Sequence, residues 1–177
     1  MAEVPFHFEC PAPLAARGFL LRPETAADVA ALRQIYFEHR RAEFAALPLG
    51  EAQLQTLIQS QFDMQRAHYC SHYPQAQFLA LLENGDTIGR LYLAESEAAI
   101  WIVDILLHLS RRNQGIASLL LNGLLAQAAH RQLAICLHVD KTNRAALLYQ
   151  RLGFRVRGES DLAWRMQAGE TASQLPS

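Results

Sequence analysis

The sequence has few of the features that mark secreted, membrane-spanning or nucleic-acid-binding proteins. Its three cysteines, Cys10, Cys70 and Cys136, form no CxxC pair and have no metal-site spacing to histidine, so we expect reduced thiols. A net charge of -1 favours neither nucleic acid nor an anionic membrane. The N-terminus has no basic segment followed by an apolar run, and the apolar segment 100–107 is far too short to span a bilayer. We therefore expect a cytoplasmic protein with no membrane or nucleic-acid partner.

The composition is that of a soluble globular protein with one domain. Of the 177 residues, 51% are hydrophobic and 19% are charged, which is enough to bury a core. Neither a repeat nor a shift in composition divides the chain. We expect an irregular N-terminal arm over 1–17, which contains three prolines, a single domain over 18–168, and a small polar tail over 169–177.

Hydrophobic periodicity predicts an α/β (α+β) chain in which a strand meander is followed by alternating helices and strands. The turn Asn84-Gly85-Asp86 and a second polar turn over 95–97 are hairpin-length links, which join antiparallel strands only. The predicted helices are one that opens at a capping box of Thr25 and Asp28, then 51–72, 115–130 and 143–152. The predicted strands are 19–22, 76–83, 87–94, 100–107, 133–139, 154–157 and 162–167.

Residues 103–123 place an apolar strand, a short polar turn and a leucine-rich helix in immediate succession. The turn, 112–117, leaves free backbone N–H groups at the positive end of the helix, and such amides suit a pyrophosphate. A P-loop would need a lysine and a second glycine that this turn lacks. A dinucleotide fold would need three glycines after the first strand, whereas this turn follows four strands. We therefore expect a pyrophosphate site that is neither a P-loop nor part of a dinucleotide-binding fold.

The segment Arg112-Asn113-Gln114-Gly115-Ile116-Ala117 resembles the Arg/Gln-x-x-Gly-x-Gly/Ala motif of the GNAT superfamily of acyl-CoA N-acyltransferases. The block 143–154, which begins 31 residues after Arg112 and ends Leu-Tyr-x-x-Leu-Gly-Phe, is similar to a second motif of that family. The segment 104–107 looks like the family's fourth strand. The resemblance covers roughly 19–167 and implies a mixed central sheet: an antiparallel N-terminal meander, a parallel fourth and fifth strand that splay to bind acyl-CoA, and about four flanking helices.

The resemblance implies a transferase that moves the acetyl group of acetyl-CoA, its co-substrate, to a primary amine by direct attack in a ternary complex. Gly115 would let the backbone approach phosphate oxygens without a Cβ in the way. Asn143 would bond the pantetheine arm, although a helix N-cap after Thr142 is an equal alternative. The residues implied in acetyl-CoA binding are Ile105, Leu106, Leu107, Arg112, Asn113, Gln114, Gly115, Ile116, Ala117, Ser118, Asn143 and Tyr149.

Two residues are the catalytic candidates. The resemblance implies that Tyr149 protonates the departing thiolate, and the alternative is a tyrosine packed on the sheet. Asp104, an acid in an otherwise apolar strand, is the candidate general base, and the alternative is a structural carboxylate. Glu97 and His138 are weaker candidates for the base. Cys136, in mid-strand with no evident base beside it, is a poor covalent nucleophile.

The sequence does not specify the amine acceptor. Residues 61–73 carry groups that could line its pocket, although aromatic and histidine residues on a helix belong more often to core and surface. His68 and His72 lie one turn apart without a further ligand, so no metal is expected. A non-catalytic acyl-CoA-binding or regulatory module on the same fold is the alternative function. A longer acyl donor and a homodimer also stay open.

Overall fold

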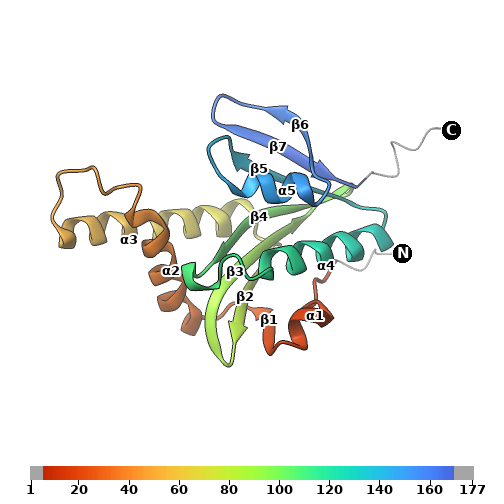
Figure 1. Cartoon of the computed structure of the whole chain (residues 1–177), viewed down its shortest axis with the longest axis horizontal. Helices are drawn as coiled ribbons and strands as arrows, with labels where there is room; N and C mark the ends of the chain where they lie inside the picture. Colours follow the sequence, from red (N-terminus) through yellow and green to blue (C-terminus); the bar gives the residue numbers. More distant parts are fainter. Residues whose placement is uncertain (1–5, 170–177) are drawn as a thin grey trace.

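Seven strands form one mixed sheet in the order β1-β2-β3-β4-β5-β7-β6 in the computed structural model, which describes residues 6–169 (Figure 1). The strands are β1 (Phe19–Pro23), β2 (Gln77–Glu83), β3 (Asp86–Glu95), β4 (Ala99–Leu107), β5 (Ala134–Asp140), β6 (Arg155–Glu159) and β7 (Ala163–Ala168). The α-helices are α1 (Ala12–Ala15), α2 (Val29–Arg41), α3 (Glu51–His72), α4 (Ile116–His130) and α5 (Ala145–Arg151). Short 3₁₀ turns cover Ala26–Asp28 and Leu109–Arg111. The predicted tail from residue 170 onward lies outside the described residues.

The sheet has the predicted division into an antiparallel meander and a mixed second half. Strands β1 to β4 pair antiparallel in sequence order, whereas β4 and β5 pair parallel. The turn between β2 and β3 contains Asn84 and Gly85 at φ 52° and 93°, the positive values that a tight hairpin turn requires. Strand β7 pairs antiparallel with both β5 and β6. The predicted mixed sheet is therefore confirmed.

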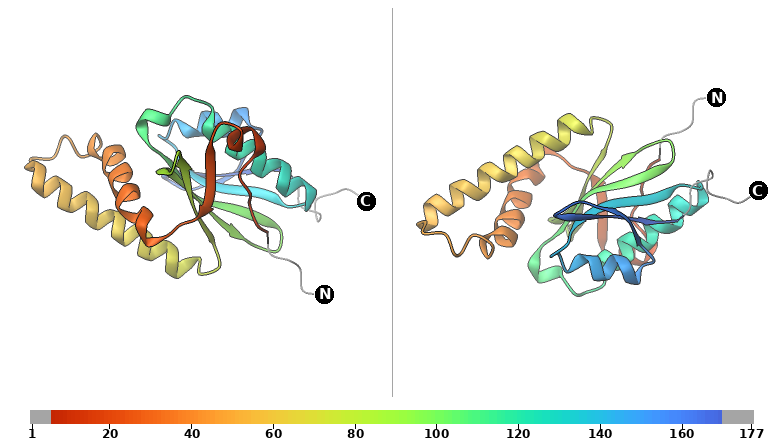
Figure 2. Two further views of the ribbon diagram at one scale, coloured as in Figure 1. Left: turned by 90° about the horizontal axis from the view of Figure 1, so that it is seen from below. Right: turned by 90° about the horizontal axis from the view of Figure 1, so that it is seen from above.

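The two faces of the sheet carry separate helices, because successive strand residues point to opposite faces. Leu91 and Leu93 of β3 belong to a core cluster that includes residues of α4 and α5. Arg90 and Tyr92 of the same strand point the other way, where the arginine lies over the ring of Phe62 of α3. Figure 2 shows α2 and α3 as a helix pair that extends beyond the sheet, away from α4 and α5.

The described part of the N-terminal arm is more ordered than the sequence suggests. It contains α1, and the side chains of Phe6, Phe8 and Leu14 are buried in the core shared with α4. Gly123 of α4 provides the space, because a Cβ there would lie 2.4 Å from Cγ of Pro11. Because isolated apolar residues anchor this segment, its sequence has no helical or strand periodicity, and the sequence therefore predicts an irregular arm.

All three cysteines are free thiols, as expected, and Cys136 is buried in β5. Within residues 6–169, no helix has both the length and the apolar character needed to cross a membrane.

Candidate active site

Strands β4 and β5 are paired over only part of their length. The parallel register joins Ala99–Ile102 to Ala134–Leu137, and beyond these residues the strands continue without further pairs. On the other side of β4, the register with β3 shifts at Tyr92/Leu93 and leaves Val103 as a bulge. Bulges bend a strand and increase its twist. The C-terminal half of β4 therefore has one edge that no strand covers.

Main-chain groups of Ile105 and Leu107 face this open edge. The backbone N–H of His108 donates to the carbonyl of Ile88 at 2.8 Å, and bonded residues alternate along an antiparallel ladder. Leu106 therefore directs its main chain toward β3, and its side chain packs against the cluster of α2 and α3. Of the three residues expected to pair with the pantetheine arm, Ile105 and Leu107 direct main-chain groups to this edge, and the carbonyl of Leu107 is already bonded to His39.

The turn after β4 has the backbone geometry of an anion site. Gly115 has φ 77° and directly precedes α4, and Asn113 has φ 59°. The first intrahelical bond runs from the N–H of Leu119 to the carbonyl of Gly115, so the N–H groups of 116–118 lack helical acceptors. A Cβ at Gly115 would have no heavy atom within 4 Å, so the approach to these amides is open. The helix dipole adds a positive potential at this point.

Two arginines bracket the turn. Nη1 of Arg17, from the N-terminal arm, donates to the carbonyl of Gln114 at 3.3 Å. Arg112 is held from the other side, where its Nη2 donates to Nδ1 of His39 at 2.5 Å. Burial lowers the pKa of Arg112, but a guanidinium still keeps its charge at neutral pH. The motif could not indicate Arg17, because this residue is distant in sequence and lies in the arm.

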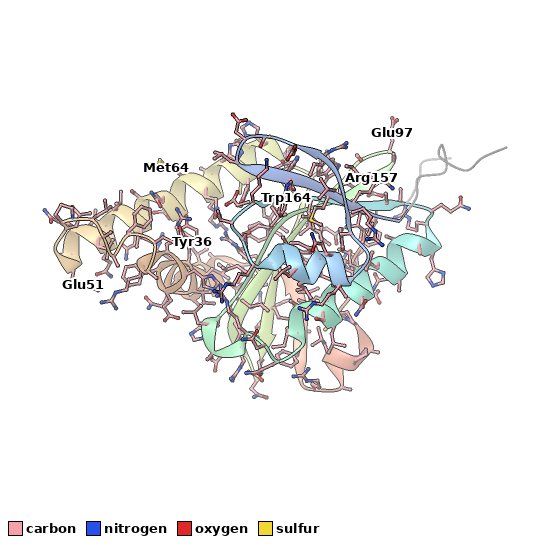
Figure 3. All side chains as sticks on the ribbon, turned by 45° about the horizontal axis from the view of Figure 1, so that its top comes forward. Tyr36, Glu51, Met64, Glu97, Arg157 and Trp164 are labelled. Atoms are coloured by element: carbon pink, nitrogen blue, oxygen red, sulfur yellow. The ribbon has the colours of Figure 1, made fainter. Side chains whose placement is uncertain are left out.

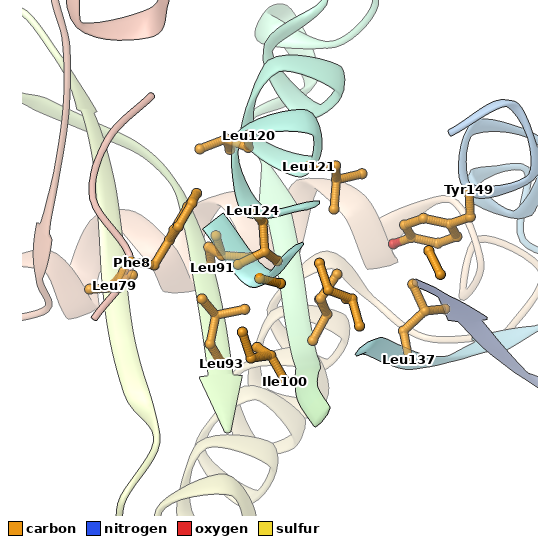
Figure 4. Close-up of a cluster of buried hydrophobic side chains, with 14 of the residues drawn as sticks. Phe8, Leu79, Leu91, Leu93, Ile100, Leu120, Leu121, Leu124, Leu137 and Tyr149 are labelled. Atoms are coloured by element: carbon orange, nitrogen blue, oxygen red, sulfur yellow. The ribbon is translucent and has the colours of Figure 1, made fainter. Parts of the chain in front are cut away.

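Tyr149 lies on α5 and is 6% exposed. Figure 4 shows its ring projecting from α5 with the hydroxyl turned toward β4. Burial, and then the negative charge of Asp104, raise the pKa of Tyr149 to about 12, so the phenol is protonated at neutral pH. The ring packs edge-on to Phe154, with centroids 5.6 Å apart. The Tyr149 ring is thus packed in the core while its hydroxyl is turned toward β4.

Asp104 is paired with a buried arginine. Its Oδ2 accepts from Nη2 and Nε of Arg90 at 2.5 and 2.6 Å, and Arg90 is 1% exposed. Arg90 also donates to Oε1 of Gln65 at 2.7 Å and lies 4.9 Å from the ring centroid of Tyr92. The Asp104 side chain itself is 20% exposed. The Asp104 carboxylate is therefore held in one orientation by Arg90 of the neighbouring strand β3.

The face of the sheet beside Asp104 carries several tyrosines from α2, α3 and β3. Tyr36 is buried, and Tyr69 packs edge-on to Tyr92, with centroids 6.0 Å apart. The Tyr92 hydroxyl donates to Glu24, a side chain only 2% exposed. Burial raises the pKa of all three phenols, so they are neutral hydrogen-bonding groups. We call Tyr36, Tyr69, Arg90, Tyr92 and Asp104 the tyrosine–arginine cluster.

The segment 61–73 divides between core and surface. Phe62 is fully buried, and Gln65 and Tyr69 point toward the cluster. Met64 is 63% exposed and lies on the outer side of α3 (Figure 3). His68 and His72 are exposed, with ring centroids 3.9 Å apart. Within the described residues, no group of three or more His, Cys, Asp or Glu side chains could hold a metal ion.

The weaker candidates for the general base occupy different places. Glu97 lies in the turn before β4, at the opposite end of that strand from the open edge, and far from Tyr36 in Figure 3. His138 is the first β5 residue after the last pair with β4, and its ring stacks on Trp101 at 5.3 Å. Oδ1 of Asn143 accepts from the N–H of Ala145, the first residue of α5, at 2.9 Å; the contact resembles the predicted cap, but the N-cap position itself is Arg144.

A parallel strand pair with an open edge, a following turn with free backbone N–H groups and a protonated phenol turned toward β4 are the features expected of an acyl-CoA-dependent acyltransferase. Residues 74–156 match the family model of the acetyltransferase (GNAT) domain. The match confirms, for this part of the chain, the resemblance inferred from the two motifs.

Solved structures with the same fold include several acetyltransferases. PaiA N-acetyltransferase from Thermoplasma acidophilum, solved with coenzyme A, is 16% identical at TM-score 0.63, covering 85% of this chain and 98% of that one. YncA from Salmonella typhimurium, solved with acetyl-CoA, is 19% identical at TM-score 0.55, over 90% and 98%. RimJ from Mycobacterium smegmatis, in complex with CoA-disulfide, is 22% identical at TM-score 0.57, over 90% and 84%. At these identities the likeness establishes the fold. None of the curated proteins matches the chain significantly.

Proposed function

We propose that this protein transfers the acetyl group of acetyl-CoA to a primary amine by direct attack in a ternary complex, in the cytoplasm. The observation that carries the proposal is the position of Tyr149. A phenol with a pKa raised to about 12 projects from α5 with its hydroxyl turned toward β4, the strand that leads into the turn that suits a pyrophosphate. Within the described residues, no group hydrogen-bonds to its hydroxyl, so the hydroxyl proton is available to a ligand.

Acetyl-CoA would bind mainly through main-chain groups. The amides of Asn113, Gln114, Gly115, Ile116, Ala117 and Ser118 would hold the pyrophosphate, and Arg17 and Arg112 would supply positive charge. The pantetheine arm would pair with the open edge of β4 at Ile105, as an added strand does. Oδ1 of Asn143 is engaged in the helix cap, which leaves its amide N–H groups to donate to the arm.

The amine nitrogen attacks the thioester carbonyl, the C–S bond breaks, and the leaving thiolate needs a proton. Tyr149 donates that proton and is reprotonated by solvent. The amine loses a proton to Asp104, directly or through water, while Arg90 fixes the orientation of the carboxylate. Oδ2 of Asp104 is bound by Arg90, so Oδ1 is the oxygen that receives the proton.

The proposal is tested by following CoA release from acetyl-CoA with a panel of primary amines, from small molecules to peptides. We expect turnover with at least one amine. In Tyr149→Phe, kcat should fall about 10²- to 10⁴-fold while the Kd of acetyl-CoA changes little, because only proton donation is lost.

Leu147→Ala, an exposed position on the same helix, is the matched control and should keep wild-type kcat. Binding of acetyl-CoA without turnover on any amine would favour the non-catalytic module. Equal kcat in wild type and Tyr149→Phe would remove Tyr149 from the mechanism.

A further inference from the structure

His39, near the C-terminal end of α2, bonds to both parts of the acetyl-CoA site. Its Nε2 lies 2.6 Å from the carbonyl oxygen of Leu107. Nη2 of Arg112 lies 2.5 Å from Nδ1 of the ring and 3.2 Å from Nε2, so Nδ1 is its nearer partner. Leu107 ends the open edge of β4, and Arg112 begins the turn before α4. A single side chain of the helix pair thus connects two segments that the motif alone assigns to the donor.

The two contacts require one protonation state of the ring. A carbonyl oxygen only accepts, so Nε2 carries a proton and donates it to Leu107. Arg112 has only donors, so Nδ1 must accept and therefore carries no proton. His39 is consequently the neutral Nε2–H tautomer. A second proton would place two donors, and two positive charges, against each other across 2.5 Å.

The surroundings of the ring favour the neutral form. Burial is the main cause that lowers the pKa of His39, and the charge of Arg112 acts in the same direction. The bond to Leu107, Asp104 of β4 and Glu38 of α2 act against it. The carboxylate of Glu38 also lies 3.3 Å from Nε2 of His108, the residue before the 3₁₀ turn Leu109–Arg111, so it does not interact with the His39 ring alone.

We propose that His39 is a positioning residue that, while neutral, fixes Arg112 beside the pyrophosphate turn and closes the edge of β4 at Leu107. The inference rests on the proposed binding of acetyl-CoA at this turn. Helix α2, which contributes Tyr36 to the tyrosine–arginine cluster, would then also take part in binding acetyl-CoA. With the carbonyl of Leu107 occupied, the free edge for the pantetheine arm ends at Ile105, which sets how far the arm extends along β4.

Protonation of His39 breaks the bond from Arg112, and the guanidinium is then repelled from its place at the turn. Above the pKa of His39 the contact is intact, and it is lost as the pH falls through that pKa. Because this pKa is lowered, the change falls below the usual histidine value of about 6.5. The effect reaches acetyl-CoA binding and its KM, and it leaves kcat at saturating acetyl-CoA nearly unchanged.

The test measures the Kd of acetyl-CoA by calorimetry at about pH 8 and at the lowest pH at which the proteins stay folded, because the pKa of His39 is lowered. The proteins are wild type, His39→Gln, His39→Ala and the matched control His130→Gln, an exposed histidine at the end of α4. Glutamine can donate to Leu107 and accept from Arg112 but does not titrate. The melting temperature of each variant, measured at both pH values, shows whether the protein is folded.

We expect the affinity of wild type and of His130→Gln for acetyl-CoA to fall about tenfold from the higher to the lower pH. A change of this size is what the loss of one hydrogen bond to a charged group produces. His39→Gln should show a smaller pH dependence, with near-wild-type affinity at the higher pH, and His39→Ala should be weak at both. The same pH dependence in His39→Gln as in wild type would overturn the inference and leave the proposed function standing. Absence of binding by folded wild type at both values would overturn both.

Discussion

The proposed donor side of this molecule and the cluster beside Asp104 are built in different ways. The proposed donor side consists of the open edge of β4 and the turn before α4, where main-chain groups and a positive-φ glycine define the geometry. We propose the tyrosine–arginine cluster, where long side chains from α2, α3 and two strands meet, as the acceptor side. A backbone site needs a few small residues at fixed spacing, whereas a side-chain site needs only that its members meet in the fold.

This difference predicts that changes on the acceptor side disturb folding most. Arg90→Met should lower the free energy of unfolding by about 3 kcal/mol, because it leaves Asp104 without a partner in a mostly buried position. The double variant Arg90→Met/Asp104→Leu should recover much of that stability and should not recover turnover. Urea unfolding followed by circular dichroism measures the first effect, and CoA release measures the second. If Arg90→Met were as stable as wild type, the Arg90–Asp104 pair would not stabilise the tyrosine–arginine cluster.

Asp28 supports the start of α2 and gives the acceptor side a pH dependence. Its buried carboxylate accepts from Arg22, from the hydroxyl of Thr87 and from the N–H of Thr25, and the arginine bond is the main cause that lowers the pKa of Asp28. This stabilisation is present above the unfolded pKa and is lost as the pH falls through the folded one. Asp28→Asn should cost about 2 kcal/mol at neutral pH, and less under strongly acidic conditions. Chemical denaturation at a series of pH values checks this, and a pH-independent difference would contradict it.

On the donor side, a substitution at the turn should affect binding more than folding. Gly115→Ala places a Cβ in the open approach to the amides and forces alanine to φ 77°. We expect about a tenfold weaker Kd for acetyl-CoA and a loss of about 1 kcal/mol in stability. Gly85→Ala, at φ 93° in the hairpin turn, is the matched control for strain and should leave the Kd unchanged. Equal effects of both variants on the Kd would mean that Gly115 acts through the fold alone.

The smallest expected effect concerns Arg17. Its guanidinium is exposed beside the turn, so its attraction for a phosphate is screened by water and salt. Arg17→Ala should raise the KM for acetyl-CoA about threefold at low ionic strength, with a smaller change at high salt. Kinetics at two salt concentrations measure it. A change in kcat instead of KM would remove Arg17 from the donor side.

The sequence predicted the strands, the meander and the turn before α4, because periodicity and local motifs carry that information. It also indicated Asp104 as an acid in an apolar strand, and the family resemblance implied Tyr149. It did not predict the partners of these groups. Arg90 meets Gln65 across 25 positions and His39 meets Leu107 across 68, and no local pattern encodes such contacts. The N-terminal arm was predicted, but its anchoring was not, since Phe6, Phe8 and Leu14 are buried against elements far along the chain.

The central claim is that the turn before α4 and the open edge of β4 hold acetyl-CoA. Calorimetric titration of the whole folded protein with acetyl-CoA tests it most directly, with Gly115→Ala and Gly85→Ala titrated in parallel. We expect one binding site per chain, weakened by the first substitution and unaffected by the second. If folded wild-type protein bound no acetyl-CoA, this claim would be wrong.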